Sequence, residues 1–378
     1  VIGDNIHRIE SLGSLNERNM DKVCQIICKH RQLYPATLKL FLHQSRTAIH
    51  LYDCTKLDED ALKSIAHICP QIDTLSLWYC GRLSPETTLL YAERLTRLRS
   101  ITLHGPFLVT DDVFATLVEA LAGQLREFAV NHTNRLGGKT IAAIAEKCHH
   151  LEMLQLSGCT AVHDADIRRL ADAVAHRGIA TLDLSGTVGQ ATDDTMIAVL
   201  RALGPSLRKL NLSGGVLFTD RLLVEGMAPY CAGLCELSLA DCSGFTDDGM
   251  RAMFERWSSG GEGQAGLELL DLAHCAQLTP TSLVPAIRYS GERLATLNVN
   301  GLYQVDDTVL EALAECCPQL AWLDLSWCRA VTDAHLEQLY ACCPALLLVK
   351  IWGCNRITEY LIPPLKHARL VGRECDTI

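Results

Sequence analysis

The sequence predicts an α/β solenoid of about 12 repeats, with parallel strands on a concave face and helices on a convex face. Three observations carry this prediction: a nine-residue apolar motif recurs, a helix-start signal often follows it, and several helices end at Cys-Pro. One copy of the motif reads Leu151-Glu-Met-Leu-Gln-Leu-Ser-Gly-Cys159. Its second apolar position is filled by Ile49, Leu75, Ile101, Phe128, Leu154, Leu182, Leu210, Leu237, Leu270, Leu297, Leu323 and Val349.

Neighbouring copies of the motif are 26 to 28 residues apart, except for one step of 33 residues between Leu237 and Leu270. A period of this size, with apolar first, fourth and sixth positions and a final Cys, is the leucine-rich-repeat pattern. Each repeat supplies one short strand and one helix, and stacking buries the leucines between neighbours. We therefore expect a leucine-rich-repeat horseshoe, whose usual role is to bind another macromolecule.

The first 46 residues do not follow the repeat. Apolar residues at helical spacing predict three helices there, marked by Ile2, Ile6, Ile9 and Leu12, by residues 20–28, and by residues 37–42. Such helices would cover the open end of the first repeat, which a solenoid needs. The sequence therefore predicts an N-terminal helical region, 1–46, and a solenoid, 47–378.

Helix-start signals follow most strands of the solenoid. A Thr stands directly before an Asp at Thr110, Thr192, Thr219, Thr246 and Thr332. We expect a Thr or Asp side chain there to accept a hydrogen bond from the first helical turn, and the carboxylate to suit the positive end of the helix. The Ser- and Gly-rich stretch 258–266 accounts for the longer step and predicts a flexible insertion.

The 18 cysteines predict reduced, buried thiols. Several occupy the last position of the motif, where a small side chain turns the chain and caps backbone groups: Cys54, Cys80, Cys159, Cys242, Cys275, Cys328 and Cys354. Others precede Pro at helix ends, as in Cys69-Pro70, Cys317-Pro318 and Cys343-Pro344. Equivalent positions one repeat apart are not natural disulfide partners, so we expect a reducing compartment.

Composition narrows the class of protein further. A formal net charge of −10 disfavours a general nucleic-acid binder, although local basic patches stay possible. We find no signal peptide and no apolar run of about 18 residues, so we expect a soluble chain without a membrane partner. The chain begins with Val1 rather than Met, which suggests a fragment.

The sequence offers no set of catalytic residues. Residues 137–140, Gly-Gly-Lys-Thr, resemble the end of a phosphate-binding loop, but Thr133 stands where that motif needs a glycine. Cys24 and Cys28 are four residues apart, and no paired C-x-x-C set for zinc is present. We expect no catalytic residue, cofactor or metal, and therefore not an enzyme.

The predicted concave face carries the candidate protein-binding residues. Residues flanking the inner leucines point out of the sheet, so Trp and Tyr there are typical of interaction hot spots, and acidic residues in the middle repeats suit a basic partner. Alternatively, the rings pack on each other or under the end caps. The candidates are His50, Tyr52, Trp78, Tyr79, Asp183, Asp271, Trp322, Asp324, Trp327, Lys350 and Trp352.

A second candidate surface follows the motif cysteines. Basic residues there form a possible nucleic-acid rim beside the tryptophans, because cations neutralise phosphates and rings stack unpaired bases. The alternative is that these side chains are only solvated. The rim residues are Lys56, Arg82, Arg135, Arg329 and Arg356.

The repeat type, with its final Cys and its Thr-Asp pairs, resembles the cysteine-containing leucine-rich repeats of F-box ubiquitin-ligase receptors. Four segments narrow the resemblance: residues 2–6, 14–31, 51–55 and 105–109. They are similar to the fungal leucine-rich-repeat subunit of global-genome nucleotide excision repair. That resemblance implies a nuclear protein that works with a Swi/Snf-type repair ATPase in recognising ultraviolet damage.

The same resemblance implies an elongin-C-binding box that links the protein to a cullin ubiquitin ligase. Val1 or Ile2 would be the last aliphatic position of this box, and its Leu and Cys would precede residue 1. The residues expected to face the adaptor are Ile2, Ile6 and Ile9. No F-box start is visible.

Three functional hypotheses follow. The leading one is a non-enzymatic interaction and damage-recognition subunit of nucleotide excision repair, which holds the ATPase or a ubiquitylation substrate and approaches elongin C and a cullin. The second is an F-box-like substrate receptor outside DNA repair. The third is a direct damaged-DNA binder that uses the basic rim.

Overall fold

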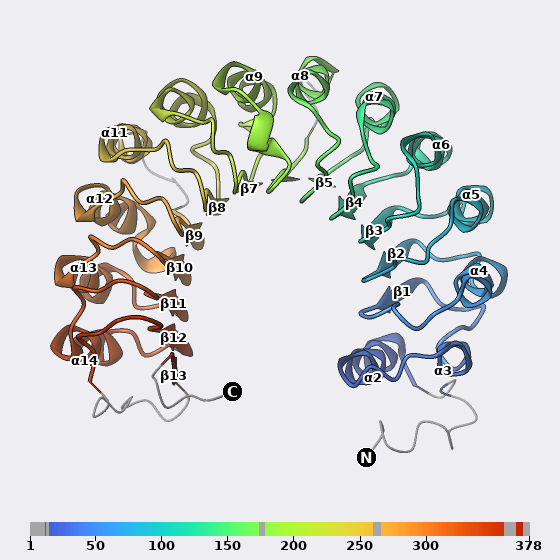
Figure 1. Ribbon diagram of the computed structural model, residues 1–378, viewed down its shortest axis with the longest axis horizontal. Coiled ribbons are helices and arrows are strands. Elements are labelled where there is room, and N and C mark those ends of the chain that lie inside the picture. The colour runs from blue at the N-terminus through green and yellow to red at the C-terminus, as the bar shows by residue number, and fades with distance from the viewer. Residues whose placement is uncertain (1–11, 13–14, 174–177, 260–265, 359–367, 373–378) are drawn as a thin grey trace. The chain divides into compact units, whose positions relative to one another are not determined.

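The computed structural model describes residues 12, 15–173, 178–259, 266–358 and 368–372. The chain divides into two compact units, Val1–Thr187 and Val188–Ile378, called here unit 1 and unit 2. Within each unit, short parallel strands follow one another in chain order, and the helices lie on one side of them (Figure 1). The predicted leucine-rich-repeat fold is confirmed.

Unit 1 begins with helices that precede the repeats and continues as a run of strand–helix repeats. Its strands are β1 (Ala48–Leu51), β2 (Thr74–Leu77), β3 (Ser100–His104), β4 (Glu127–Asn131), β5 (Met153–Gln155) and β6 (Thr181–Asp183). Its helices are α2 (Glu17–Lys29), α3 (Pro35–Lys39), α4 (Glu59–Ile68), α5 (Pro85–Arg94), α6 (Asp111–Leu121), α7 (Gly138–Lys147) and α8 (Asp164–Ala173).

Unit 2 follows the same plan with more varied helices. Its strands are β7 (Lys209–Asn211), β8 (Glu236–Ser238), β9 (Leu269–Asp271), β10 (Thr296–Asn298), β11 (Trp322–Asp324), β12 (Leu348–Lys350) and β13 (Arg369–Val371). Its helical segments are η2 (Val188–Gln190), α9 (Asp193–Leu203), the π-helix η3 (Leu222–Met227), α10 (Ala228–Tyr230), α11 (Asp247–Ser258), α12 (Pro280–Ser290), η4 (Gly291–Arg293), α13 (Asp307–Cys316) and α14 (Asp333–Cys342).

The periodic apolar residues form the core of each unit. Every predicted second-apolar position, from Ile49 to Val349, lies within one of the strands β1–β12 and is at most 2% exposed. Burying one such side chain stabilises a fold by about 1.5–3 kcal/mol. The additional strand β13 was not predicted, because it is joined to β12 by backbone pairing and lacks the apolar spacing of the motif.

Six of the seven motif thiols donate to backbone carbonyls of a neighbouring repeat, and Cys54 donates to Leu51 of its own repeat. Cys159 Sγ donates to the Val130 carbonyl at 3.0 Å, and Cys275 Sγ donates to the Leu239 carbonyl at 3.1 Å. Burial raises the pKa of both thiols to about 12. They are therefore protonated donors at neutral pH, and the described cysteines are free thiols.

The Thr-Asp pairs work differently from the prediction. The Thr192 hydroxyl accepts from Thr195 N in its own helix, but Thr110, Thr246 and Thr332 make no side-chain cap. The cap prediction is therefore wrong for those three residues. The hydroxyls of Thr246 and Thr332 instead donate to carboxylates of the preceding repeat, Asp220 and Asp307, because a charged acceptor makes the stronger hydrogen bond. Thr219 does both: its hydroxyl donates to Asp193 and accepts from Arg221 N at 3.3 Å.

This carboxylate–threonine ladder recurs along both units. Asp247 accepts from Thr279 N at 2.9 Å, from Thr279 Oγ1 at 2.6 Å and from Ser282 Oγ at 2.5 Å. Asp111 accepts from the amides of Gly137 and Thr140 at 2.9 and 3.0 Å. Each bridge ties the start of one helix to the start of the next, so the ladder fixes the stacking of the repeats.

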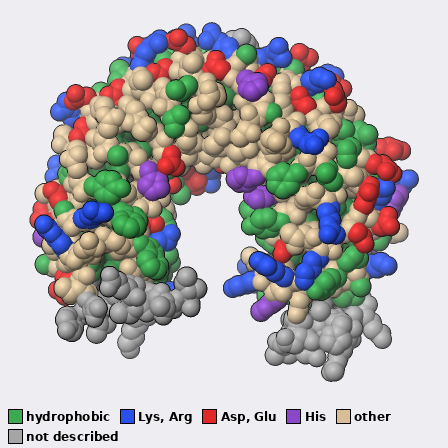
Figure 2. All heavy atoms as spheres, viewed as in Figure 1, with side chains coloured by type: hydrophobic (Ala, Val, Ile, Leu, Met, Phe, Trp, Pro, Cys, Tyr) green, Lys and Arg blue, Asp and Glu red, His purple; other side chains and the backbone are tan. Residues whose placement is uncertain are grey.

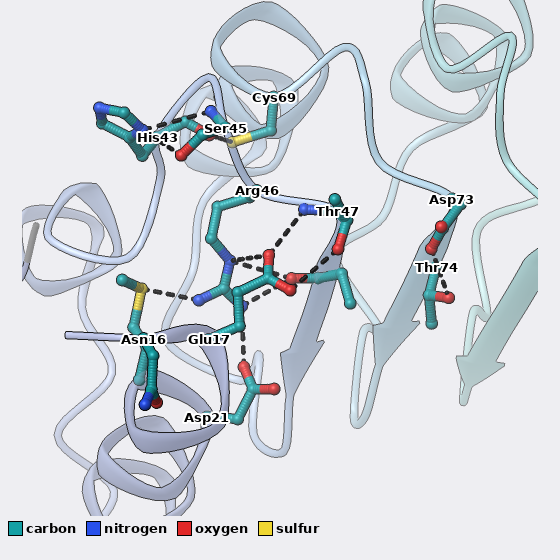
Figure 3. A network of polar contacts seen from close by, with 12 residues as sticks. Asn16, Glu17, Asp21, His43, Ser45, Arg46, Thr47, Cys69, Asp73 and Thr74 are labelled. Atoms are coloured by element: carbon teal, nitrogen blue, oxygen red, sulfur yellow. Dashed lines mark hydrogen bonds and ion pairs between the residues drawn. The ribbon is translucent and has the colours of Figure 1, made fainter.

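The N-terminal helices are attached to the first strand by a buried arginine (Figure 3). Arg46 is 4% exposed, and its Nη2 lies 2.8 Å from Asp21 of α2 and 2.6 Å from the Ala48 carbonyl of β1. Glu17 accepts from Thr47 N at 2.8 Å. The network holds α2 beside β1 and so positions the loops that end the first repeats.

Candidate protein-interaction surface

Unit 1 carries a group of rings at the carboxyl ends of β2, β3 and β4. The Trp78 ring stacks on the His104 ring with centroids 5.2 Å apart and an interplanar angle of 13°. Tyr79 meets the same imidazole edge-on at 5.0 Å, and the His104 and His132 centroids are 4.7 Å apart. Trp78 is 39% and Tyr79 53% exposed. These residues form the N-terminal ring cluster.

Two members of the N-terminal ring cluster have a left-handed backbone. The φ angles of Tyr79 and His132 are 55° and 56°. Glycine fills this position in several other repeats, as at Gly158, where an added Cβ would lie 2.8 Å from His132 Nδ1. A non-glycine residue here costs about 1–2 kcal/mol. Rings kept at that cost indicate a role for the side chains.

The surroundings of the imidazole at the centre of the cluster favour its uncharged form. Burial, and then the neighbouring His132, lower the pKa of His104 below its ordinary value. His104 Nδ1 is buried and has no hydrogen-bond partner among the described residues. The lowered pKa therefore favours an uncharged aromatic face at His104.

A cavity of about 770 Å³ lies beside the cluster, between α2 and the loops of the first two repeats. Its walls include Lys29 and Arg31 from the end of α2, and Tyr52, Lys56 and Tyr79 from the loops. Tyr52 is partly buried, and this burial raises its pKa. Three predicted residues are thus brought to one cavity: Tyr52 and Tyr79 of the concave face and Lys56 of the rim. Cations and hydrophobic side chains gather on the visible face of this part of unit 1 (Figure 2).

Lys56 is exposed, but its side chain makes contacts within the chain. Its Nζ donates to the Arg31 carbonyl at 2.8 Å and to Tyr34 Oη at 2.7 Å, and it lies 4.4 Å from the centroid of the Tyr34 ring. His50, in β1, is half-buried, and its carbonyl accepts from Cys24 Sγ at 3.4 Å. Lys56 therefore braces the cavity wall, and sequence reasoning about an open basic rim did not anticipate this contact.

In unit 2, three predicted residues form one cross-strand cluster. Asp324 is 5% exposed, accepts from Ser326 N at 3.0 Å and lies 3.3 Å from Lys350 Nζ. The same Nζ lies 4.7 Å from the centroid of the Trp322 ring. The carboxylate of Asp324 in β11 thus neutralises Lys350 of β12, and the ammonium group of Lys350 lies over the Trp322 ring. This pairing leaves less charge for a partner.

The exposed rings of unit 2 lie in the loops after β10, β11 and β12. Tyr303 is 57%, Trp327 47% and Trp352 41% exposed. Trp327 is also left-handed, with φ 67°, and an added Cβ at Gly353 would lie 2.5 Å from its Cε3. The Arg329 guanidinium carbon lies 5.7 Å from the Tyr303 centroid. We name Tyr303, Trp327 and Trp352 the C-terminal ring cluster.

The acidic residues of the middle repeats serve their own loops. Asp183 accepts from Ser185 N at 2.9 Å, and Asp271 accepts from Ala273 N at 3.1 Å. Asn298 accepts from Asn300 N in the same way. Burial raises the pKa of Asp271 even though these hydrogen bonds oppose the shift. These side chains close an Asx-type turn at the end of each strand.

The remaining predicted residues fall into two groups. Arg82, Arg135 and Arg356 are exposed, and their side chains have no ion pair or hydrogen bond with the described residues. The predicted adaptor-facing residues Ile2, Ile6 and Ile9 lie outside the described residues. The sequence prediction missed His104, His132 and Tyr303. His132 stands at the left-handed position that glycine fills in several other repeats, and this substitution is a signal that could have identified it.

The structure also explains the loop that resembles a phosphate-binding loop. Asp111 accepts from Gly137 N, Lys139 N, Thr140 N and Thr140 Oγ1, so a carboxylate of the same chain occupies the start of α7. Burial opposes ionisation of Asp111, but these hydrogen bonds outweigh it and lower its pKa.

Within the described ranges, no three His, Cys, Asp or Glu side chains are grouped to hold a metal, and no helix is long and apolar enough to cross a membrane.

The repeats define the class: a leucine-rich-repeat protein of the cysteine-containing type. The chain is 34% identical over 311 residues to the DNA repair protein rhp7 of Schizosaccharomyces pombe and 29% identical over 322 residues to the DNA repair protein RAD7 of Saccharomyces cerevisiae. Each match covers 82% of this chain and 54% of the relative, so the chain spans about half the length of these relatives.

Two further comparisons agree. The crystal structure of yeast Rad7 in complex with Elc1 matches with a TM-score of 0.86 and 28% identity, over 97% of this chain and 90% of that one. A putative F-box/LRR-repeat protein of Arabidopsis thaliana is 34% identical over 108 residues, 29% of this chain and 32% of that protein. No protein-family model matches. The chain belongs to the Rad7-like family of fungal leucine-rich-repeat proteins.

Proposed function

We propose that this chain is a non-enzymatic interaction subunit of nucleotide excision repair that binds elongin C. The observation that carries the proposal is the match to yeast Rad7, a protein crystallised with Elc1, over 97% of this chain. Similarity to two DNA repair proteins supports the repair role. Such a role places the protein in the nucleus, where its substrate is.

The finer assignment extends this role to a larger assembly. The chain acts with a Swi/Snf-type ATPase in damage recognition and serves as the substrate receptor of a cullin ubiquitin ligase. The N-terminal segment that holds Ile2, Ile6 and Ile9 approaches the adaptor. Exposed rings at two sites, with Trp78 and Tyr79 in one and Trp327 and Trp352 in the other, supply contacts to the ATPase or to a ubiquitylation substrate.

The proposal is tested with purified partners and with nuclear extract. The chain is expected to form a stable complex with purified elongin C, and to recover a cullin and a Swi/Snf-type ATPase from extract after nuclease treatment. Recovery of Skp-type adaptors without elongin C would favour an F-box-like receptor outside repair. Trp352→Ala is expected to weaken recovery of the ATPase or of a substrate with little dependence on salt.

A second candidate function is direct binding of damaged DNA. It is favoured by the exposed Arg82, Arg135 and Arg356 side chains, which have no partner among the described residues. Arg82→Ala and Arg356→Ala would then each reduce affinity for damaged duplex DNA and flatten its salt dependence by about one unit. Unchanged DNA binding in both variants would eliminate this function.

A further inference from the structure

The cavity beside α2 has a charge unlike that of the whole chain. The chain carries a formal net charge of −10, yet the cavity walls include Lys29, Arg31 and Lys56 against one carboxylate, Asp53. The Asp53 carboxylate is engaged by its own loop, because its Oδ1 accepts hydrogen bonds from Thr55 N at 3.0 Å and from Thr55 Oγ1 at 2.6 Å. The cavity therefore favours a negatively charged ligand.

The three cations of the cavity have different roles: Lys56 is hydrogen-bonded within the chain, whereas Lys29 and Arg31 are free. Lys56 holds the Arg31 carbonyl and the Tyr34 hydroxyl, so it fixes the wall. The side chains of Lys29 and Arg31 are exposed and make no ion pair or hydrogen bond with the described residues. These two groups are available to pair with carboxylates that enter the cavity.

Two wall residues are kept in a backbone conformation that favours glycine. Arg31 has φ 54° at the position after the end of α2, and Tyr79 has φ 55° at the carboxyl end of β2. Arg31 N donates to the Cys28 carbonyl there, a helix ending that most often uses glycine. A cation and a ring at two such positions of one cavity indicate that the side chains are needed there.

Tyr79 joins the cavity to the rest of the N-terminal ring cluster. It lines the cavity and also contacts His104, which contacts Trp78 and His132. Adjacent strands lie about 4.8 Å apart, so an extended chain laid over these repeats meets rings along about 10–15 Å. The cavity and the cluster form one strip with cations at its start and aromatic faces along its length.

We propose that this strip binds an extended acidic peptide, with carboxylates paired to Lys29 and Arg31 and an apolar or aromatic side chain laid on the N-terminal ring cluster. A nucleic-acid strand fits less well, because it needs cations along its whole backbone, and here they are concentrated at one end. The inference sharpens the proposed function and rests on its protein-interaction role. Binding of elongin C is a separate test, so either can fail alone.

The test uses the whole chain and a displayed library of random peptides about 12 residues long, extended over about 40 Å. Selection is expected to enrich Asp or Glu together with Trp, Phe or Leu. Fluorescence anisotropy with the selected peptide then compares variants. Lys29→Ala is expected to weaken binding at least about fivefold, and the matched control Lys22→Ala, on the same helix but outside the cavity walls, is expected to leave it unchanged.

Arg31→Gly separates binding from folding. Glycine suits the left-handed position, so the variant is expected to keep or raise Tm while it loses at least about fivefold in peptide affinity. The proposal is overturned if the library yields no acidic enrichment, or if Lys29→Ala and Arg31→Gly bind the peptide as the wild type does. It is also overturned if labelled oligothymidylate binds more tightly than the selected peptide and competes with it.

Discussion

The two ring clusters look alike in sequence and differ in chemistry. In the N-terminal ring cluster, Trp78 stacks on His104, whose pKa is lowered, beside the cavity whose free cations are Lys29 and Arg31. In unit 2, the C-terminal ring cluster has Arg329 beside Tyr303, and the neighbouring Lys350 lies over the Trp322 ring and pairs with the buried Asp324. The comparison teaches that a Trp next to a Lys, such as Trp322 beside Lys350, is not by itself a binding site, because a cross-strand carboxylate decides whether the charge is available.

The largest expected effect on stability concerns the Asp324–Lys350 pair of unit 2. Asp324→Ala removes a carboxylate that is 7% exposed, so Lys350 loses its partner and Ser326 N loses its acceptor. We expect a loss of about 3 kcal/mol in the free energy of unfolding, measured by urea denaturation. Asp324→Asn keeps the acceptor for Ser326 N and is expected to lose less than half as much. Equal losses in the two variants would mean that the charge pair is the whole effect.

The next effect tests whether the carboxylate–threonine ladder stabilises the stacking of the repeats in both units. Asp247→Ala in unit 2 and Asp111→Ala in unit 1 each remove the acceptor of several hydrogen bonds between repeats. Each variant is expected to lower the free energy of unfolding by about 2 kcal/mol. Asp248→Ala, whose side chain is 87% exposed, is the matched control and is expected to change it by less than about 0.5 kcal/mol.

The ladder also predicts a pH dependence. Burial opposes ionisation of Asp247, but the Ser282 and Thr279 hydrogen bonds outweigh it, so its pKa is lowered, as it is for Asp111. A carboxyl group with a lowered folded pKa stabilises above its unfolded pKa of about 3.9, and this contribution is lost as pH falls through the folded pKa. Asp247→Ala should therefore show a flatter decline in stability below about pH 4 than the wild type.

A smaller effect of opposite sign is expected at Asp271, because burial raises its pKa. The ionised carboxylate is then slightly unfavourable in the fold at neutral pH, and it becomes less so as pH falls. Asparagine already closes the same turn at Asn298. Asp271→Asn is expected to leave Tm at neutral pH unchanged or raise it by a few degrees. A clear fall in Tm would show that the charge is needed where it stands.

The smallest effect concerns the N-terminal ring cluster itself. The lowered pKa of His104 predicts an imidazole titration midpoint below about 6.5, followed by NMR of its ring protons. Because the folded pKa is lowered, this residue costs stability as pH falls below the unfolded value. In His132→Ala the His104 midpoint is expected to rise, since one of the causes of its shift is removed. An unchanged midpoint would assign the whole shift to burial.

The sequence alone predicted the fold because each copy of the apolar motif forms one strand, so the spacing of the leucines gives the length of one repeat. Ile49 to Val349 all lie in strands, and the thiol of Cys159 caps a neighbouring repeat as expected. Side-chain pairing between repeats could not be read in the same way. The stack on His104 and the engagement of Lys56 depend on which residues meet about 26 positions apart, and the motif leaves those positions free.

The measurement that tests the central claim most directly is isothermal titration calorimetry of the purified protein at its natural length with purified elongin C. The account predicts a saturable one-to-one complex whose affinity is unchanged by Arg31→Gly, because that residue belongs to the peptide strip. No binding at micromolar concentrations would contradict assignment of the chain to an elongin-C-linked repair assembly.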